Sequence, residues 1–304
     1  MARVRALFVG TVAMVSLSAC ASGLAARSET GARFQSDRIT VTTSGSGPDV
    51  ILVPGLASSA ADVWAGTVAA VPGYRYHLVQ VHGFAGVPAG ANGDGGPVVA
   101  PLVEEVARYI REARLERPAF IGHSLGGGVG LALAVRHPDA VSRLMVVDMV
   151  PWMGTFFGPP GTVTPETAGP IAERVRAAWE TPDDEPWRRL HTSSVNSMIQ
   201  TESLRPRAID SGIASDRGVA ARAMRDLILQ DLRADLARVA IPIRVLYVQG
   251  PHLPLDAAQA DAVFRAAYAA APRVTLERIP NAWHFIMLDQ PERFADEVRA
   301  FLRR

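Results

Sequence analysis

Short apolar runs separated by helical stretches constrain the fold of this 304-residue chain more than any other feature. Several runs are continuously apolar, as at residues 50–53 and 144–147, which is typical of parallel strands buried on both faces. Alternating strands and helices predict an α/β fold, with a mostly parallel, doubly wound sheet of about eight strands and helices on both faces. The clearest strand segments are residues 39–43, 50–53, 76–81, 119–121, 143–148, 243–248 and 274–279.

The alternation stops between residues 151 and 240, where no strong strand segment occurs. This region begins with prolines and glycines and continues with helical spacing at residues 171–180, 187–200 and 219–236. A helical insertion between two strands is therefore expected, forming a cap over residues 151–240. The α/β core is then divided into residues 38–150 and 241–304.

The N-terminus has the features of an export signal. Arg3 and Arg5 precede an apolar run of signal-peptide length, too short for a comfortable membrane span. Residues 17–20, Leu-Ser-Ala-Cys, resemble a bacterial lipobox. The resemblance implies that residues 1–19 form a signal peptide and that Cys20 becomes the lipidated first residue, in the cell envelope. The alternative is an ordinary secretory signal, with a secreted or periplasmic protein.

Cys20 is the only cysteine of the chain, so no disulfide can form within it. The small and polar residues after it predict a tether over residues 20–37. Removal of residues 1–19 takes two of 31 basic residues and leaves 29 against 30 acidic residues, a net charge of about −1. This balance favours neither nucleic acid nor a strongly charged partner, and membrane contact is expected through the lipid alone.

The histidines show no metal-site spacing, and no dinucleotide or phosphate-loop glycine motif occurs. We therefore expect no cofactor and no metal, a small acyl compound as the partner, and a monomer.

The sequence Gly-His-Ser-Leu-Gly, residues 122–126, lies between the apolar run 119–121 and a helical stretch at 125–136. A sharp turn from strand to helix would hold Ser124 in a strained conformation. Gly122 and Gly126 would let the neighbouring backbone approach closely, because neither has a Cβ. The helix N-terminus would supply the free N–H of Leu125. This pattern favours Ser124 as a nucleophile.

The strand–GxSxG–helix pattern resembles the nucleophile elbow of the α/β-hydrolase family, and the resemblance extends over residues 38–304. It implies a serine–acid–histidine triad in that chain order and a cap after the sixth strand. It also implies an oxyanion hole made by two backbone N–H groups, those of Leu56 and Leu125. Leu56 lies in Pro-Gly-Leu-Ala, where many relatives have His-Gly.

The base implied by the resemblance is His284, in Asn-Ala-Trp-His-Phe at residues 281–285. It is the only histidine after the last strand segment, and this motif is similar to the terminal histidine motif of the family. His123 is the competing candidate. Because adjacent residues on a tight turn point apart, we expect His123 to pack beneath the turn.

The acid is harder to assign, because Leu253 occupies the position where most relatives have it. Asp148 ends the strand after the nucleophile helix, as in certain lipases and haloalkane dehalogenases, and is the preferred candidate. Asp256 is the alternative, although it begins a helical stretch and is expected as an N-cap. A third possibility is that the triad has no functional acid. A haloalkane dehalogenase is disfavoured, since those enzymes use an aspartate nucleophile and this chain has Ser124.

These features predict a serine hydrolase for a carboxylic ester or related acyl substrate, acting through an acyl-enzyme. The alternatives are a peroxidase-like or C–C bond hydrolase with the same triad, or a non-catalytic envelope binding protein with a degenerate triad. Trp64 is expected either to close the substrate pocket or to anchor a helix. Four apolar residues at the start of the cap are expected either to line an acyl pocket or to pack within the cap: Trp152, Met153, Phe156 and Phe157.

Overall fold

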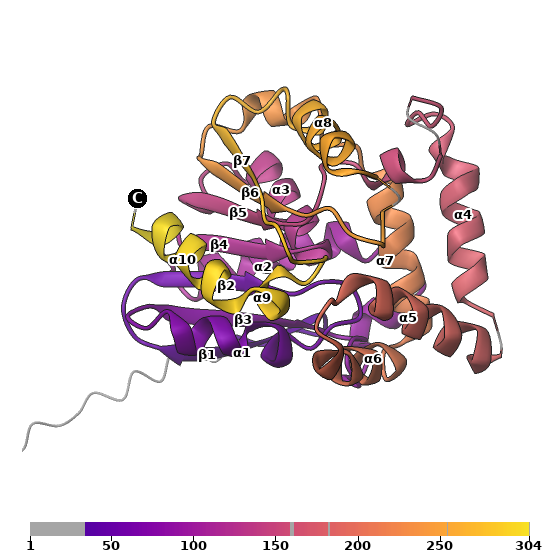
Figure 1. The fold of residues 1–304 in the computed structure, drawn as a ribbon. Coiled ribbons are helices and arrows are strands. Elements are labelled where there is room, and N and C mark those ends of the chain that lie inside the picture. Colours follow the sequence, from indigo (N-terminus) through magenta and orange to yellow (C-terminus); the bar gives the residue numbers. More distant parts are fainter. Residues whose placement is uncertain (1–33, 159–160, 182, 254, 304) are drawn as a thin grey trace, which may run out of the picture. The chain divides into compact units, whose positions relative to one another are not determined.

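A computed structural model describes residues 34–158, 161–181, 183–253 and 255–303 (Figure 1). Its centre is one seven-stranded sheet with the order β1-β3-β2-β4-β5-β6-β7, in which only β1 runs antiparallel to its neighbour. The strands are β1 (Ile39–Gly45), β2 (Asp49–Val53), β3 (Arg75–Val81), β4 (Ala119–His123), β5 (Arg143–Val147), β6 (Ile243–Tyr247) and β7 (Val274–Arg278). The expected α/β class and mostly parallel sheet are therefore confirmed.

Two details of the expected sheet were wrong. The described chain has seven strands rather than about eight, because its residues before β2 contribute only the single strand β1. For the same reason the cap follows the fifth described strand, β5, and not the sixth. The continuous apolar runs behave as predicted, since β4 is buried along its whole length and β2 and β5 are buried except at their first residue.

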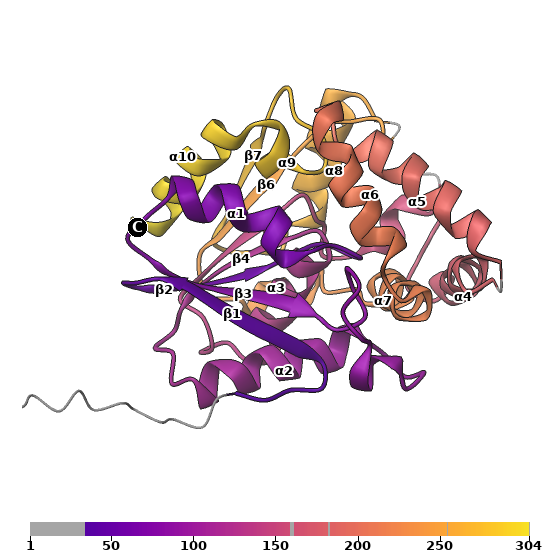
Figure 2. The same cartoon turned by 90° about the horizontal axis from the view of Figure 1, so that it is seen from below.

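Helices cover both faces of the sheet, as a doubly wound sheet requires. One face is packed by α1 (Ala60–Ala70), α9 (Ile286–Asp289) and α10 (Pro291–Leu302). The other face is packed by α2 (Val99–Glu112), α3 (Leu125–Arg136) and α8 (Ala257–Ala267). Figure 2 shows α1 and α10 on one side of the sheet and α2 on the other.

The segment between β5 and β6 is helical and lies beside one end of the sheet (Figure 1). Its α-helices are α4 (Ala168–Trp179), α5 (Asp184–Met198), α6 (Arg205–Ile213) and α7 (Arg217–Leu229). The sequence pattern did not predict the short helix α6, which begins with proline in its first turn. The last predicted helical stretch was residues 219–236, but α7 ends at Leu229. The backbone leaves the helix there, and the Leu232 N–H donates to the Pro151 carbonyl at 3.1 Å.

Asp226 of α7 fastens the cap to the core. Its carboxylate accepts the backbone N–H groups of Val98 at 2.7 Å and Val99 at 3.0 Å, at the start of α2. Helix α2 has no capping side chain of its own, since its N-cap is Val98. The cap helix therefore supplies the acceptor that the N-terminus of a core helix requires.

The predicted signal peptide, Cys20 and the tether up to residue 33 lie outside the described residues. The last part of the predicted tether is described, and Phe34 packs on the core. Its ring meets Tyr109 edge-on, with centroids 4.9 Å apart, and the Arg108 guanidinium lies 4.4 Å from its centre. Within residues 34–303, apart from the undescribed positions, no helix is long and apolar enough to cross a bilayer.

Candidate active site

Ser124 occupies a strained turn between β4 and α3. Its φ of +50° and ψ of −118° are rare for a residue with a side chain. A Cβ at Gly122 would collide with the Gly126 carbonyl, and a Cβ at Gly126 would collide with the Val53 carbonyl of β2. The two glycines are thus required by the packing of the turn against itself and against β2. The turn leaves Ser124 partly exposed at the carboxyl end of the sheet.

The loop after β2 lies directly on this turn. A Cβ on Gly55 would be 2.9 Å from His123 Nδ1 and 3.3 Å from Ser124 Cβ, and the Gly126 N–H donates to the Pro54 carbonyl at 3.1 Å. In the described part of the chain, the backbone N–H groups of Leu56 and Leu125 donate to no other residue. Leu125 is also the first residue of α3, where the helix dipole favours negative charge. Two free amides beside Ser124 are suited to binding an oxyanion.

Asp148 follows β5 at the same end of the sheet as Ser124. His123 pairs with Val147, and these are the last residues of the neighbouring parallel strands β4 and β5. Ser124 and Asp148 are the residues that directly follow these two strand ends. Asp148 has a φ of +50°, and only 5% of the residue is exposed. Its Oδ1 accepts the Val248 N–H at 3.1 Å, and its Oδ2 accepts the Nδ1–H of His284 at 2.6 Å.

The Asp148 carboxylate is charged although it is buried. Burial alone would raise the pKa of this carboxyl group, but the adjacent imidazoles of His252 and His284 hold the pKa well below its usual range. Because the carboxylate accepts the Nδ1 proton of His284, the neutral imidazole presents an unprotonated Nε2. Among the described residues this Nε2 has no hydrogen-bond partner, so it is free to accept a proton.

Asp256, the alternative acid, has another role. It is exposed at the N-cap of α8, where its Oδ1 accepts the Gln259 N–H at 2.8 Å. The Gln259 side chain in turn accepts the Asp256 N–H at 2.8 Å, which completes a capping box. The structure therefore brings Asp148 to His284 and places Asp256 in a helix cap.

His123 is fully buried beneath the turn, as its position next to the nucleophile predicted. Its Nε2–H donates to the His284 carbonyl at 3.1 Å, and its ring centre lies 4.6 Å from the ring centres of His284 and Phe285. Burial lowers the pKa of His123 well below its usual value, so the ring stays neutral. His123 thus supports the loop that carries His284.

Two backbone contacts hold the residues on either side of His284. The Trp283 N–H donates to Asp289 Oδ2 at 3.0 Å, and the Phe285 N–H donates to the carbonyl of Met198, the last residue of α5, at 3.2 Å. The Asp289 carboxylate also accepts the two backbone N–H groups that follow α5 in the cap, those of Gln200 and Thr201. The position of the histidine loop is therefore coupled to the cap.

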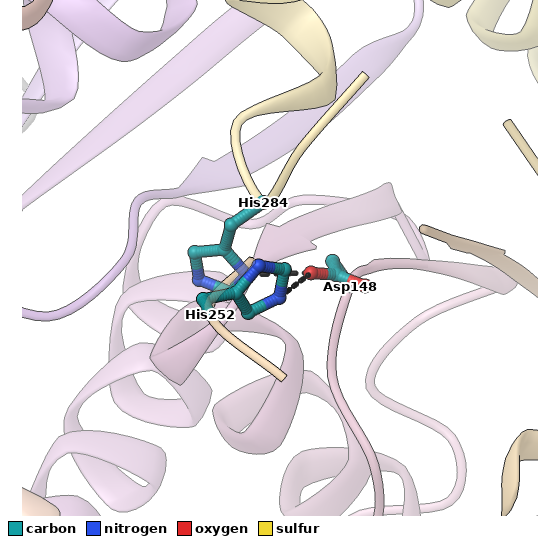
Figure 3. A group of neighbouring side chains, drawn as sticks. All are labelled: Asp148, His252 and His284. Atoms are coloured by element: carbon teal, nitrogen blue, oxygen red, sulfur yellow. Dashed lines mark hydrogen bonds and ion pairs between the residues drawn. The ribbon is translucent and has the colours of Figure 1, made fainter. Parts of the chain in front are cut away.

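The structure adds a residue that the sequence analysis did not select, His252. It lies in the loop after β6, and its Nε2 is 3.4 Å from Asp148 Oδ2, too poorly aligned for a hydrogen bond. Figure 3 shows His252 and His284 approaching the same carboxylate from different loops. Its neighbour Leu253 stands where relatives carry the acid, so the loop itself was a signal.

The two tryptophans proposed for the pocket are packing residues. Trp64 is fully buried and lies against Phe294 of α10, so it anchors α1. Trp152 is 2% exposed, and its Nε1–H donates to the Ile228 carbonyl within the cap at 2.8 Å. The other three proposed residues are partly buried against the core or the cap: Met153, Phe156 and Phe157.

Comparisons with known proteins agree with this fold. A family described as "Alpha/beta hydrolase family" matches residues 50–297. A pimeloyl-[acyl-carrier protein] methyl ester esterase from Vibrio atlanticus is 24% identical over 88% of this chain and 100% of its own length. The mouse sn-1-specific diacylglycerol lipase ABHD11 is 26% identical over 60% of this chain, which spans 58% of the mouse protein. An enol-lactonase from Burkholderia xenovorans has a similar fold, with a TM-score of 0.69 at 19% identity, over 88% of this chain and 96% of its own.

Proposed function

Because the chain belongs to the alpha/beta hydrolase family, and is therefore a hydrolase, we propose that it cleaves a carboxylic ester or a related acyl substrate through an acyl-enzyme. The observation that carries this proposal is the hydrogen bond from His284 Nδ1 to the buried Asp148 carboxylate. It leaves the other ring nitrogen free at the end of the sheet where Ser124 lies in its strained turn.

In the proposed reaction His284 Nε2 takes the proton of Ser124 as Oγ attacks the substrate carbonyl carbon. The carbonyl oxygen becomes an oxyanion, which accepts hydrogen bonds from the N–H groups of Leu56 and Leu125. The imidazolium then gives its proton to the leaving alkoxide, and the alcohol departs. Water attacks the acyl-enzyme by the same steps, again with His284 as base, and releases the acid and free Ser124.

Asp148 acts in this scheme by holding His284. It fixes the tautomer with the proton on Nδ1 and stabilises the imidazolium that forms in each half-reaction. Its negative charge persists despite burial because N–H groups surround it. The ester preference is supported by two relatives, whose names describe a methyl ester esterase and a diacylglycerol lipase.

Labelling with a fluorophosphonate probe tests the nucleophile without a known substrate. The proposal predicts rapid, stoichiometric labelling, with the modified peptide containing Ser124. Labelling should disappear in Ser124→Ala and His284→Ala, and it should remain unchanged in the control Asp256→Asn. Folded wild-type protein that does not label would overturn the proposal and favour a binding role. A positive result should be followed by a panel of esters and lactones.

The N-terminal segment supports a separate proposal about location, a lipid anchor on Cys20 in the bacterial cell envelope. Intact-mass analysis of membrane-extracted protein should show a diacylglyceryl group on a chain that begins at residue 20. Cys20→Ser should remove that mass and release the protein from the membrane fraction. Equal mass and equal fractionation of the two proteins would contradict the anchor and favour secretion.

A further inference from the structure

His252 transfers no proton in the proposed reaction, yet its side chain is buried beside Asp148. Only 7% of this side chain is exposed, and neither ring nitrogen has a hydrogen-bond partner among the described residues. A buried polar group without a partner destabilises a fold, so such a group calls for a ligand or a function. The ring points toward the Asp148 carboxylate, which His284 approaches from another loop (Figure 3).

We propose that Asp148, His252 and His284 bind a divalent transition-metal ion of the zinc type, and that the bound ion switches the hydrolase off. The three residues each offer one donor atom, and these atoms all lie within 4.8 Å of one another. Two imidazoles and a carboxylate suit zinc, whereas calcium and magnesium prefer oxygen donors alone. The switching half of this proposal rests on the proposed function; the binding half does not.

Two of the three donor separations require movements of less than 1 Å. The two histidine nitrogens lie within 4.8 Å of each other and must approach by at most about 1.5 Å. A tetrahedral zinc ion with ligands at about 2.0–2.1 Å places its donor atoms roughly 3.3 Å apart. The separation of 3.4 Å between Asp148 Oδ2 and His252 Nε2 already fits. The separation of 2.6 Å between Asp148 Oδ2 and His284 Nδ1 must open by less than 1 Å, which becomes possible when the proton between them moves to Nε2 of the same ring.

Other features of the cluster suit a metal ion. Asp148 supplies the negative charge, and its second oxygen is held by the Val248 N–H at 3.1 Å, as outer-shell partners hold metal-binding carboxylates. Three protein ligands leave a fourth position for water. His252 lies two residues after Gly250, in a loop between β6 and α8, so its side chain can adjust without disturbing the sheet.

Metal binding would stop the reaction through the tautomer of His284. A neutral imidazole that binds a metal through Nδ1 carries its single proton on Nε2. The proton that Asp148 accepts in the free protein therefore moves to the other ring nitrogen, with no net release from this ring. Nε2 then has no lone pair for the proton of Ser124, and the serine is not activated.

Cobalt(II) absorption tests the binding half independently of catalysis. Untagged wild-type protein and Ser124→Ala should each bind one equivalent of Co²⁺ with a visible d–d band, which Zn²⁺ displaces. His252→Gln should lose the band. The matched control is His137→Gln, at a partly exposed histidine paired with Glu104 on the surface, and it should keep the band. Equal bands in all four proteins would overturn the site.

X-ray absorption of the zinc-loaded wild type checks the ligands without any substitution, and so guards against a His252 variant that does not fold. Two imidazoles and one carboxylate are expected around the ion, and a set with fewer than two imidazoles would contradict the proposal.

The switching half is tested by the rate of fluorophosphonate labelling. Saturating Zn²⁺ should slow the wild type at least tenfold, and a chelator should restore the rate. His252→Gln should resist Zn²⁺, so that adding saturating Zn²⁺ changes its own labelling rate less than twofold. A cobalt band in a protein that never labels would leave the site standing and overturn the proposed function. Fast labelling without a cobalt band and without inhibition by Zn²⁺ would overturn the metal site and leave the proposed function standing.

Discussion

Two aspartate–histidine pairs lie at opposite ends of the same sheet, and they differ in one respect that matters. At the carboxyl end, Asp148 binds Nδ1 of His284 at 2.6 Å, and the second ring nitrogen has no partner in the described chain. At the amino end, Asp49 binds Nε2 of His77 at 2.8 Å, and the second ring nitrogen accepts the Tyr109 hydroxyl at 2.6 Å. The first pair can take a proton, whereas the second is saturated and can only stabilise the fold.

Backbone strain is distributed in the same unequal way. Seven described residues other than glycine have a positive φ, and five of them lie in loops that follow the carboxyl ends of strands: Ala57, Ala85, Ser124, Asp148 and Asn281. The other two, Arg114 and Arg117, lie between α2 and β4. Strain that concentrates at one end of a sheet marks a site that the remaining structure holds in place.

The comparison predicts opposite results for matched substitutions of the two histidines. His284→Gln should lower the rate of labelling or ester hydrolysis by about 10³-fold or more, because the base is lost. His77→Gln should change the rate less than threefold but lower the free energy of unfolding by about 1–3 kcal/mol, because a buried hydrogen-bond network is broken. Kinetics and urea unfolding of both variants measure the difference. A large rate loss in His77→Gln would break the comparison.

The glycines of the turn provide a second contrast. Gly126→Ala should lower the free energy of unfolding by about 3 kcal/mol or more, since its Cβ would strike the Val53 carbonyl. Gly66→Ala is the control, because Gly66 lies within α1 with open space around its Cβ position. It should raise stability by about 0.5–1 kcal/mol. Destabilisation of the same size in both variants would show that the close approach at the turn is unimportant.

The saturated pair should also affect how stability depends on pH. Burial lowers the pKa of His77 below its usual value, although Asp49 partly offsets the effect. The unfolded chain therefore binds the proton more readily, and stability falls as the pH drops below about 6.5, at most about 1.4 kcal/mol per pH unit from this residue. Urea unfolding at pH 7.5 and 5.5 should show a larger loss for the wild type than for His77→Gln. Equal losses would contradict this assignment.

Substitution of Asp256 should cause the smallest loss of stability and tests whether Asp148 or Asp256 is the acid. Asp256→Ala should lower stability by about 1 kcal/mol through loss of the α8 cap, with labelling unchanged. A drop in labelling at unchanged stability would return Asp256 to the candidates for the acid.

Local signals account for what the sequence could predict. Continuous apolar runs marked the inner strands β2, β4 and β5, because parallel strands in the middle of the sheet are buried on both faces. The alternating segment at residues 39–43 marked the antiparallel strand β1. Ser124 followed from the strand–glycine–helix pattern, and Asp148 followed from its place at the end of the neighbouring strand. These inferences depended on residues close together in the sequence or on the known adjacency of strand ends.

Three features that depend on tertiary contacts did not follow from local sequence patterns. His252 meets Asp148 across 104 residues and comes from a loop without helical or strand periodicity. The saturation of His77 by Tyr109 requires the packing of α2 on β3. Trp64 and Trp152 are apolar residues whose burial in packing, rather than in a pocket, is decided by their neighbours in space.

The measurement that tests the central claim most directly is the fluorophosphonate labelling rate of Asp148→Asn beside that of Asp49→Asn, with unfolding free energies for both. The account predicts that Asp148→Asn labels at least about 10³-fold more slowly than wild type, because an amide no longer fixes the Nδ1–H tautomer of His284. Asp49→Asn should label at the wild-type rate and be the less stable of the two. Wild-type labelling by folded Asp148→Asn, or equal slowing in both variants, would contradict the account.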